Sequence, residues 1–86
     1  MYTVYVIRSV VTGLLYTGQT GDFERRFKQH QLGIARYTRG RGPWAIMLTE
    51  EYNTLQEAMK RERFLKSGTG REWLKEILTK GENPPD

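Results

Sequence analysis

Five polar side chains in this sequence could together do chemistry. They are Tyr5, Tyr16, Arg26, His30 and Glu62. The two tyrosines lie on short strand-like runs, the arginine and the histidine are four residues apart on one helical face, and the glutamate lies within a second helical segment. A hydrophobic core requires none of these groups. Hydrolysis of a phosphodiester requires a base, a cation for the phosphate and a carboxylate for a metal ion, and this set supplies all three.

Each of the first four residues also has a structural interpretation, because tyrosine favours strands and arginine and histidine are common on helix surfaces. As a base, a phenol with an ordinary pKa near 10 needs that pKa lowered, and Arg26 or a bound divalent ion could lower it. The planar guanidinium suits a phosphate that gains charge. His30 is the single histidine of the chain and could relay a proton or hydrogen-bond the phosphate.

Glu62 stands among basic neighbours, which also permits a surface salt bridge. Ala58 precedes it by one helical turn and, being small, leaves room beside the carboxylate. A single carboxylate can hold Mg²⁺ when water and substrate phosphate complete the octahedron. No second carboxylate is an obvious partner, so we expect one Mg²⁺ or Mn²⁺ rather than a two-metal site, and no organic cofactor.

Positive charge is concentrated in one stretch. The net charge is +4, and the residues from Arg25 to Thr49 include six basic side chains and no acidic one. A one-sided basic surface favours nucleic acid, although a merely solvated surface is the alternative. The loop 33–43 is rich in arginine and glycine, and Tyr37 and Trp44 could stack on unpaired bases. The candidate nucleic-acid-binding residues are Arg25, Lys28, Arg36, Tyr37, Arg39, Arg41 and Lys66.

The elements that must position these groups follow from local pattern. Strands are expected over 2–8, 14–17 and 44–52, with Gly13 in a hairpin turn and Gly18 ending the second strand. Helices are expected over 23–32, with Asp22 or Thr20 as N-cap, over 54–66 behind a capping box, and over 71–80. Phe23 and Phe27 should face the core. The predicted fold is α+β, a small, mainly antiparallel three-stranded sheet flanked by helices in the order ββαβαα.

Composition bounds the remaining possibilities. Eighty-six residues make one small domain, expected over 1–80 with a flexible tail over 81–86. The chain contains no cysteine, no apolar run of about 20 residues that could span a membrane, and no recognisable signal peptide. We expect a cytoplasmic protein that is a monomer or weak dimer.

Three ordered blocks add a resemblance. They are the triplet at 3–5 (TVY), the triplet at 16–18 (YTG) followed by Thr20, Phe23, Arg26, Phe27 and His30, and a helical block with Glu57, Ala58, Glu62 and Lys66. In this respect the chain resembles the GIY-YIG endonuclease superfamily over about residues 2–78, and most closely its small stand-alone members. The first triplet lacks the usual Gly and Ile, Thr17 replaces the second Ile, and the asparagine that some members carry after the glutamate helix is missing from 71–80.

The resemblance implies a role for each residue. Tyr5 would activate the attacking water as general base, with Tyr16 as assistant or alternate. Arg26 would stabilise the pentacoordinate phosphate, and His30 would hydrogen-bond the site and pass on the proton. Glu62 would bind the metal ion, which supports the leaving oxygen. Lys66 would contact the nucleic-acid backbone.

The leading hypothesis is therefore a metal-dependent DNA endonuclease, of use in DNA repair or recombination. No additional DNA-binding domain is recognisable, so either the chain is weakly selective or its loop from Arg36 to Arg41 selects. Because Tyr37 and Trp44 could stack on unpaired bases, we expect single-stranded, flapped or branched DNA rather than plain duplex. Two alternatives remain open at this point. One is a nucleic-acid-binding module with little catalysis, and the other is an interaction domain for an acidic protein partner.

Overall fold

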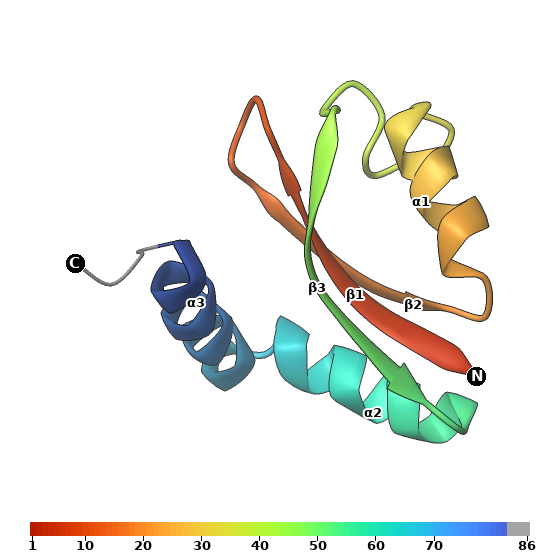
Figure 1. The fold of residues 1–86 in the computed structure, drawn as a ribbon, viewed down its shortest axis with the longest axis vertical. Coiled ribbons are helices and arrows are strands. Elements are labelled where there is room, and N and C mark those ends of the chain that lie inside the picture. Colours follow the sequence, from red (N-terminus) through yellow and green to blue (C-terminus); the bar gives the residue numbers. More distant parts are fainter. Residues whose placement is uncertain (83–86) are drawn as a thin grey trace.

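The computed structural model describes residues 1–82, with side chains to residue 79. The described elements confirm the order ββαβαα (Figure 1). They are β1 (Tyr2–Ser9), β2 (Leu15–Thr20), α1 (Phe23–Gln31), β3 (Trp44–Tyr52), α2 (Leu55–Lys66) and α3 (Gly68–Glu82). No helix among the described residues is long and apolar enough to cross a membrane.

The three strands form one antiparallel sheet in the order β2-β1-β3, so β1 is its central strand. Four consecutive residues of β1 are buried, with Val4 and Val6 on one face and Tyr5 and Ile7 on the other. Such a run is expected for a strand that is covered on both faces, since successive side chains point to opposite sides. The sheet therefore separates two different packed layers.

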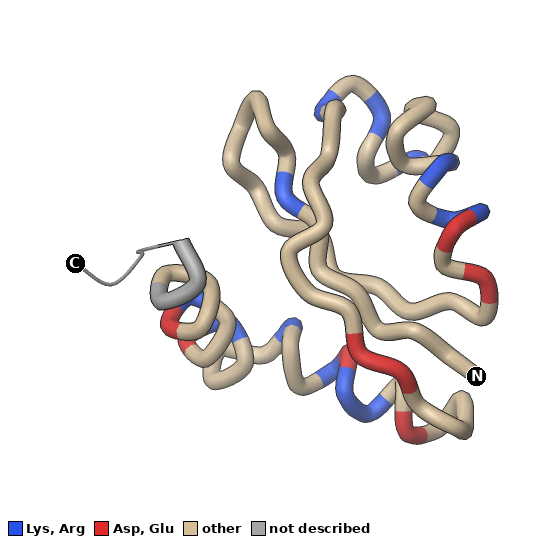
Figure 2. Tube along the Cα trace, in the orientation of Figure 1, with Lys and Arg blue, Asp and Glu red and all other residues tan. Residues whose placement is uncertain are grey.

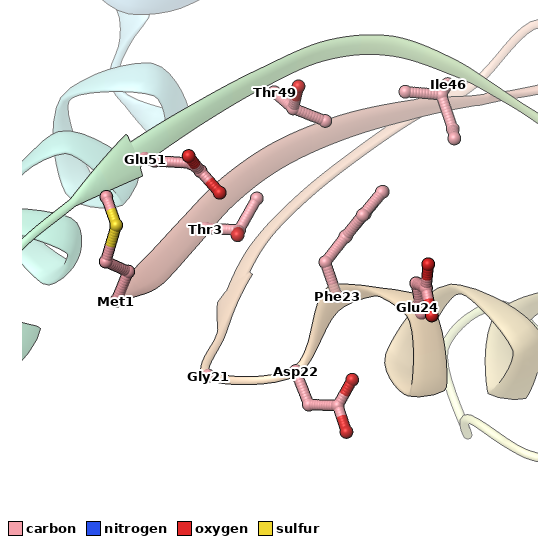
Figure 3. Close-up of a pocket in the computed structure, with 9 residues that line it drawn as sticks. All are labelled: Met1, Thr3, Gly21, Asp22, Phe23, Glu24, Ile46, Thr49 and Glu51. Carbon is pink, nitrogen blue, oxygen red and sulfur yellow. The ribbon is translucent and has the colours of Figure 1, made fainter.

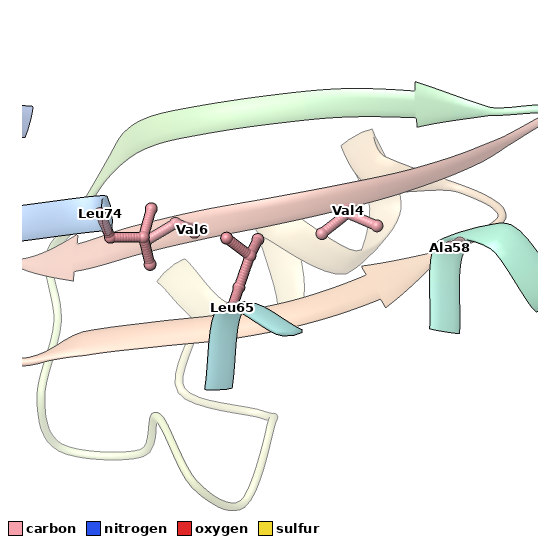
Figure 4. Packing of buried hydrophobic residues seen from close by; sticks show 5 residues of the cluster. All are labelled: Val4, Val6, Ala58, Leu65 and Leu74. Atoms are coloured by element: carbon pink, nitrogen blue, oxygen red, sulfur yellow. The ribbon is translucent and has the colours of Figure 1, made fainter. Parts of the chain in front are cut away.

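Helices α2 and α3 cover one of these layers. Val4 and Val6 of the sheet pack there with Ala58, Leu65 and Leu74 of the two helices (Figure 4). Burying each of the two leucines contributes about 1.5–3 kcal/mol. This layer carries most of the aliphatic core.

Helix α1 and the loop after it cover the opposite face. Tyr5, Ile7 and Trp44 are buried here, and Phe23 and Phe27 pack against them with ring centroids 5.8 Å apart. The expected core position of the two phenylalanines is confirmed. Trp44, by contrast, is 3% exposed, so the expectation that it stacks on unpaired bases is wrong.

Local signals set several element boundaries as expected. Asp22 caps α1 by accepting a hydrogen bond from the Arg25 amide at 3.2 Å, and Thr54 caps α2 in the same way from Glu57. Gly13 takes the hairpin position with a φ of 79°, in the left-handed region that suits glycine.

Three boundaries differ from expectation. Strand β2 continues through Gly18 to Thr20, because this glycine is paired with Tyr5 inside the sheet. Helix α3 begins at Gly68, so Ser67 alone interrupts the helical run. Helix α3 also continues to Glu82, two residues into the expected tail, and residues 83–86 lie outside the described part of the chain.

Candidate active site

The centre of the candidate site is a buried contact between a strand tyrosine and a helix histidine. β1 directs Tyr5 towards α1, and its hydroxyl lies 2.8 Å from Nε2 of His30. Both residues are only 1% exposed. The sequence therefore brings together two polar groups, 25 residues apart, in a place that water does not reach.

Gly18 makes room for this tyrosine. A Cβ atom at position 18 would lie 2.7 Å from the Tyr5 hydroxyl oxygen and 2.9 Å from its ring. Any side chain at position 18 would displace the phenol. Gly18 is therefore needed to leave space for the Tyr5 ring on the neighbouring strand, and not to end β2.

The hydrogen bonds of His30 identify its tautomer. Its Nδ1 lies 2.8 Å from the hydroxyl oxygen of Thr38, and that hydroxyl donates to the carbonyl of Ala35 at 3.3 Å. A threonine hydroxyl has one proton, so it accepts from the histidine and the Nδ1 atom carries the hydrogen. The neutral ring then has its lone pair on Nε2, which accepts from the phenol of Tyr5.

Burial sets the protonation states of this pair. Burial, followed by the charge of Arg26, lowers the pKa of His30 from 6.5 to about 4. Burial, followed by the neighbouring Tyr16, raises the pKa of Tyr5 from 10.0 to about 12, and Arg26 only partly offsets this. Arg26 acts on the phenol of Tyr5 in the expected direction, but burial outweighs it, and Tyr5 is a neutral donor facing a neutral acceptor at pH 7.

Arg26 and Tyr16 complete the cluster. Burial opposes the charge on the guanidinium, but hydrogen bonds to Tyr5 and Tyr16 outweigh it and raise the pKa of Arg26. The Tyr16 ring meets His30 edge-on with centroids 4.9 Å apart and stacks on Tyr37 at 5.2 Å. Four of the five residues that the sequence singled out are thus in one cluster.

The fifth, Glu62, belongs to the other layer. It lies on α2, which packs on the face of the sheet away from Tyr5, and it accepts a hydrogen bond from Lys66 at 2.7 Å. Ala58, expected to leave open space beside this carboxylate, is instead completely buried in the core. The connection between the layers is Lys66, which lines the same groove at the edge of β2 as Tyr16.

A divalent metal ion fits Glu62 as a single protein ligand. Its carboxylate is the oxygen donor that Mg²⁺ prefers, and its side chain is 21% exposed, enough for water and phosphate to reach it. Within the described residues no group of three or more histidine, cysteine, aspartate or glutamate side chains could hold a metal ion. Any bound ion would therefore take most of its ligands from water and substrate.

The candidate nucleic-acid-binding residues differ in how exposed their side chains are. Arg25, Lys28, Arg36 and Arg39 have exposed side chains on α1 and the following loop. Arg41 is partly buried, and its guanidinium lies 4.9 Å from the Tyr37 ring centroid. Figure 2 shows these basic positions along one end of the molecule.

A second hollow lies on the α1 side of the sheet, between the start of α1 and the strands (Figure 3). Three carboxylates line it, those of Asp22, Glu24 and Glu51. Because these carboxylates repel phosphate, this hollow does not suit a nucleic-acid backbone.

Two residues of the site region were missed by sequence reasoning. Thr38 is completely buried and orients the histidine. Gln31 holds the end of α1 against the start of β3, because its side-chain amide accepts from the Trp44 amide at 2.7 Å and donates to the Trp44 carbonyl at 2.9 Å. A polar residue in an otherwise basic, glycine-rich loop was the available signal for Thr38. Gln31 gave none.

Comparison with known proteins is consistent with this geometry. The family model described as the GIY-YIG catalytic domain matches residues 1–76. The chain belongs to the GIY-YIG catalytic domain family. The match covers the sheet, α1, α2 and the first part of α3, and therefore every residue of the cluster.

Relatives align with this chain over most of their own length. A UPF0213 protein of Halobacterium salinarum is 45% identical over 77% of this chain and 86% of its own length. A UPF0213 protein of Clostridium perfringens is 38% identical over 93% of this chain and 86% of its own. The solution NMR structure of a UPF0213 protein from Bacillus halodurans has a TM-score of 0.55 at 38% identity, over 90% of this chain and 85% of that one.

Proposed function

We propose that this GIY-YIG domain is a metal-dependent DNA endonuclease. The observation that supports this best is the cluster of Tyr16, Tyr5 and His30, in which the Tyr5 hydroxyl lies 2.8 Å from Nε2 of His30 and the charge of Arg26 acts on both phenols. A structural core gains nothing from placing an arginine close to two phenols. A site that cleaves a phosphodiester gains a base for water from the phenols and a cation for the phosphate from the arginine.

In this proposal Tyr16, rather than Tyr5, faces the attacking water. Tyr5 is sealed inside the sheet layer, whereas Tyr16 is half-buried and lines a groove open to solvent. Tyr16 releases its phenol proton to the solvent of the groove and, beside the positive charge of Arg26, accepts the proton of the water, while Tyr5 and His30 stay neutral and hold the cluster in place. One proton leaves the water, and it restores the Tyr16 phenol that had released its own proton to solvent.

The remaining groups act on the phosphate. Arg26 faces the oxygens that gain charge as the phosphorus becomes pentacoordinate. A divalent ion held by Glu62 would supply positive charge at the leaving oxygen. Tyr37 is 53% exposed and stacked on Tyr16, which supports a preference for single-stranded, flapped or branched DNA, as arises in repair and recombination, because an unpaired base can contact the exposed part of its ring.

The test is a cleavage assay with Mg²⁺ or Mn²⁺ on labelled single-stranded, flapped and duplex DNA. Glu62→Gln is expected to abolish metal-dependent cleavage, and Glu51→Gln, an exposed glutamate on β3, serves as the control that retains it. Cleavage that survives in Glu62→Gln would disprove the metal assignment. If the wild type cleaves none of these substrates and yet binds them in a salt-sensitive way, the protein is a binding module instead.

A further inference from the structure

A groove runs from the tyrosine cluster across the edge of β2 to α3, and it was not among the sites expected from the sequence. Tyr16 and Tyr37 line one end of it, and Lys66, Arg71 and Lys75 line the other. Between them the wall is apolar and includes the half-exposed Leu14 and Leu15. The groove thus begins at the proposed site of reaction and ends on a helix outside it.

The charge in this groove has one sign. Its ionisable lining groups, tyrosines aside, are those of Arg8, Lys66, Arg71 and Lys75, and all are basic. On α3 the acidic Glu72 and Glu76 line a neighbouring hollow, which Lys75 also lines, but they do not line this groove. Figure 2 shows this mixture of charges along α3.

Two of these basic groups are available to a ligand. The side chains of Arg71 and Lys75 are exposed, and they form no hydrogen bond or ion pair with any residue that the structure describes. They are four residues apart, so they lie on one face of α3. Arg61 provides the contrast, because Glu50 binds it at 2.8 Å and the Trp73 ring lies 4.6 Å from it.

We propose that this groove binds the single-stranded DNA segment adjoining the scissile phosphate, with backbone phosphates on Arg71 and Lys75 and a base on Tyr37. The inference rests on the proposed nuclease function, since it uses Tyr16 as the point where the strand enters. Apolar lining between an aromatic ring and two cations suits unstacked bases with their phosphates. A paired duplex presents its phosphates outward and its bases inward, and would leave the apolar wall uncovered.

The experiment measures binding without cleavage, by fluorescence anisotropy of a labelled single-stranded oligonucleotide in EDTA over a range of salt concentrations. Each phosphate contact on a single strand contributes about 0.7 to the slope of log affinity against log salt. Replacing both Arg71 and Lys75 by glutamine should therefore reduce the slope by about 1.4 and weaken binding roughly twenty-fold at 0.1 M salt.

The control is Lys60→Gln with Arg63→Gln, the same change of charge at two exposed positions of α2 outside the groove. Circular dichroism verifies that both double variants are folded. An equal loss of slope in the two double variants, or none in the α3 variant, would overturn the proposal. The proposal would also be overturned if the α3 variant lost more affinity for duplex DNA than for single-stranded DNA.

The two proposals fail in different ways. If the wild type cleaves DNA and the α3 variant binds like the wild type, the groove assignment is wrong and the nuclease stands. If no substrate is cleaved but the α3 variant alone loses its salt slope, the groove assignment holds and the nuclease does not.

Discussion

Protonation of His30 provides the sharpest test of the buried cluster. In the folded protein its pKa is lowered to about 4, first by burial and then by the charge of Arg26. In the unfolded chain the ring returns to a pKa near 6.5. Because the unfolded state takes up the proton first as the pH falls, the stabilisation is fully present above about pH 6.5 and is lost between pH 6.5 and 4.

The size of the effect follows from the two pKa values. One pKa unit corresponds to about 1.36 kcal/mol, so a fall from 6.5 to about 4 corresponds to about 3 kcal/mol of unfolding free energy. That is a large part of the 5–15 kcal/mol typical of a small domain. Acid should therefore destabilise this protein more than its surface carboxylates alone would.

The measurement is direct because the chain has one histidine. NMR of a ¹⁵N-labelled sample should show one imidazole, protonated on Nδ1 at pH 7 and titrating near pH 4. Urea unfolding at pH 7 and pH 4 should then show the wild type losing about 3 kcal/mol more than His30→Gln, since carboxylate contributions cancel between them.

An imidazole that titrates near pH 6.5, or one protonated on Nε2 at pH 7, would refute the reasoning. The first result would mean that water reaches the ring. The second would reverse the hydrogen bonds that His30 makes with Tyr5 and Thr38, and Tyr5 would then have to accept a hydrogen bond rather than donate one.

Two further predictions concern positions that the cluster and the helix junction depend on. Thr38→Val removes the acceptor of the His30 Nδ1 hydrogen and should cost about 1–3 kcal/mol in urea unfolding, whereas Thr38→Ser should retain most of the stability and the same tautomer by NMR. Gly70→Ala should destabilise by about 1–3 kcal/mol or more, because its Cβ would lie within van der Waals overlap of the Phe64 carbonyl. Gly68→Ala, where a Cβ meets nothing within 4 Å, should not be destabilising in a thermal melt; equal losses at the two glycines would contradict the packing argument.

Much of the fold could be predicted because its signals are local. The capping box at Thr54, the cap at Asp22 and the turn glycine at 13 each depend on hydrogen bonds or backbone angles within a few residues. The pairing of Arg26 and His30 on one helical face needs only the helical repeat. None of these requires knowledge of what packs against the element.

The features that sequence reasoning missed depend on distant contacts. Gly18 looks like a strand terminator until the Tyr5 ring is known to lie across it. Thr38 looks like a loop residue until the loop is seen to return to α1 and reach His30. Helical periodicity shows that Glu62 and Ala58 share a side of α2, but not that this side meets the opposite face of the sheet.

That placement of Glu62 has a consequence for the proposed chemistry. A phosphate buried on the α1 face could contact Arg26 and the phenols, but the sheet would lie between it and the carboxylate. β2 is an edge strand, and Tyr16 and Lys66 line one groove along it from the two sides. A scissile phosphate at this edge could face the phenol from one layer and a metal ion on the carboxylate from the other. The proposed reaction therefore requires the substrate strand to pass over the edge of β2, along the path on which Arg71 and Lys75 lie.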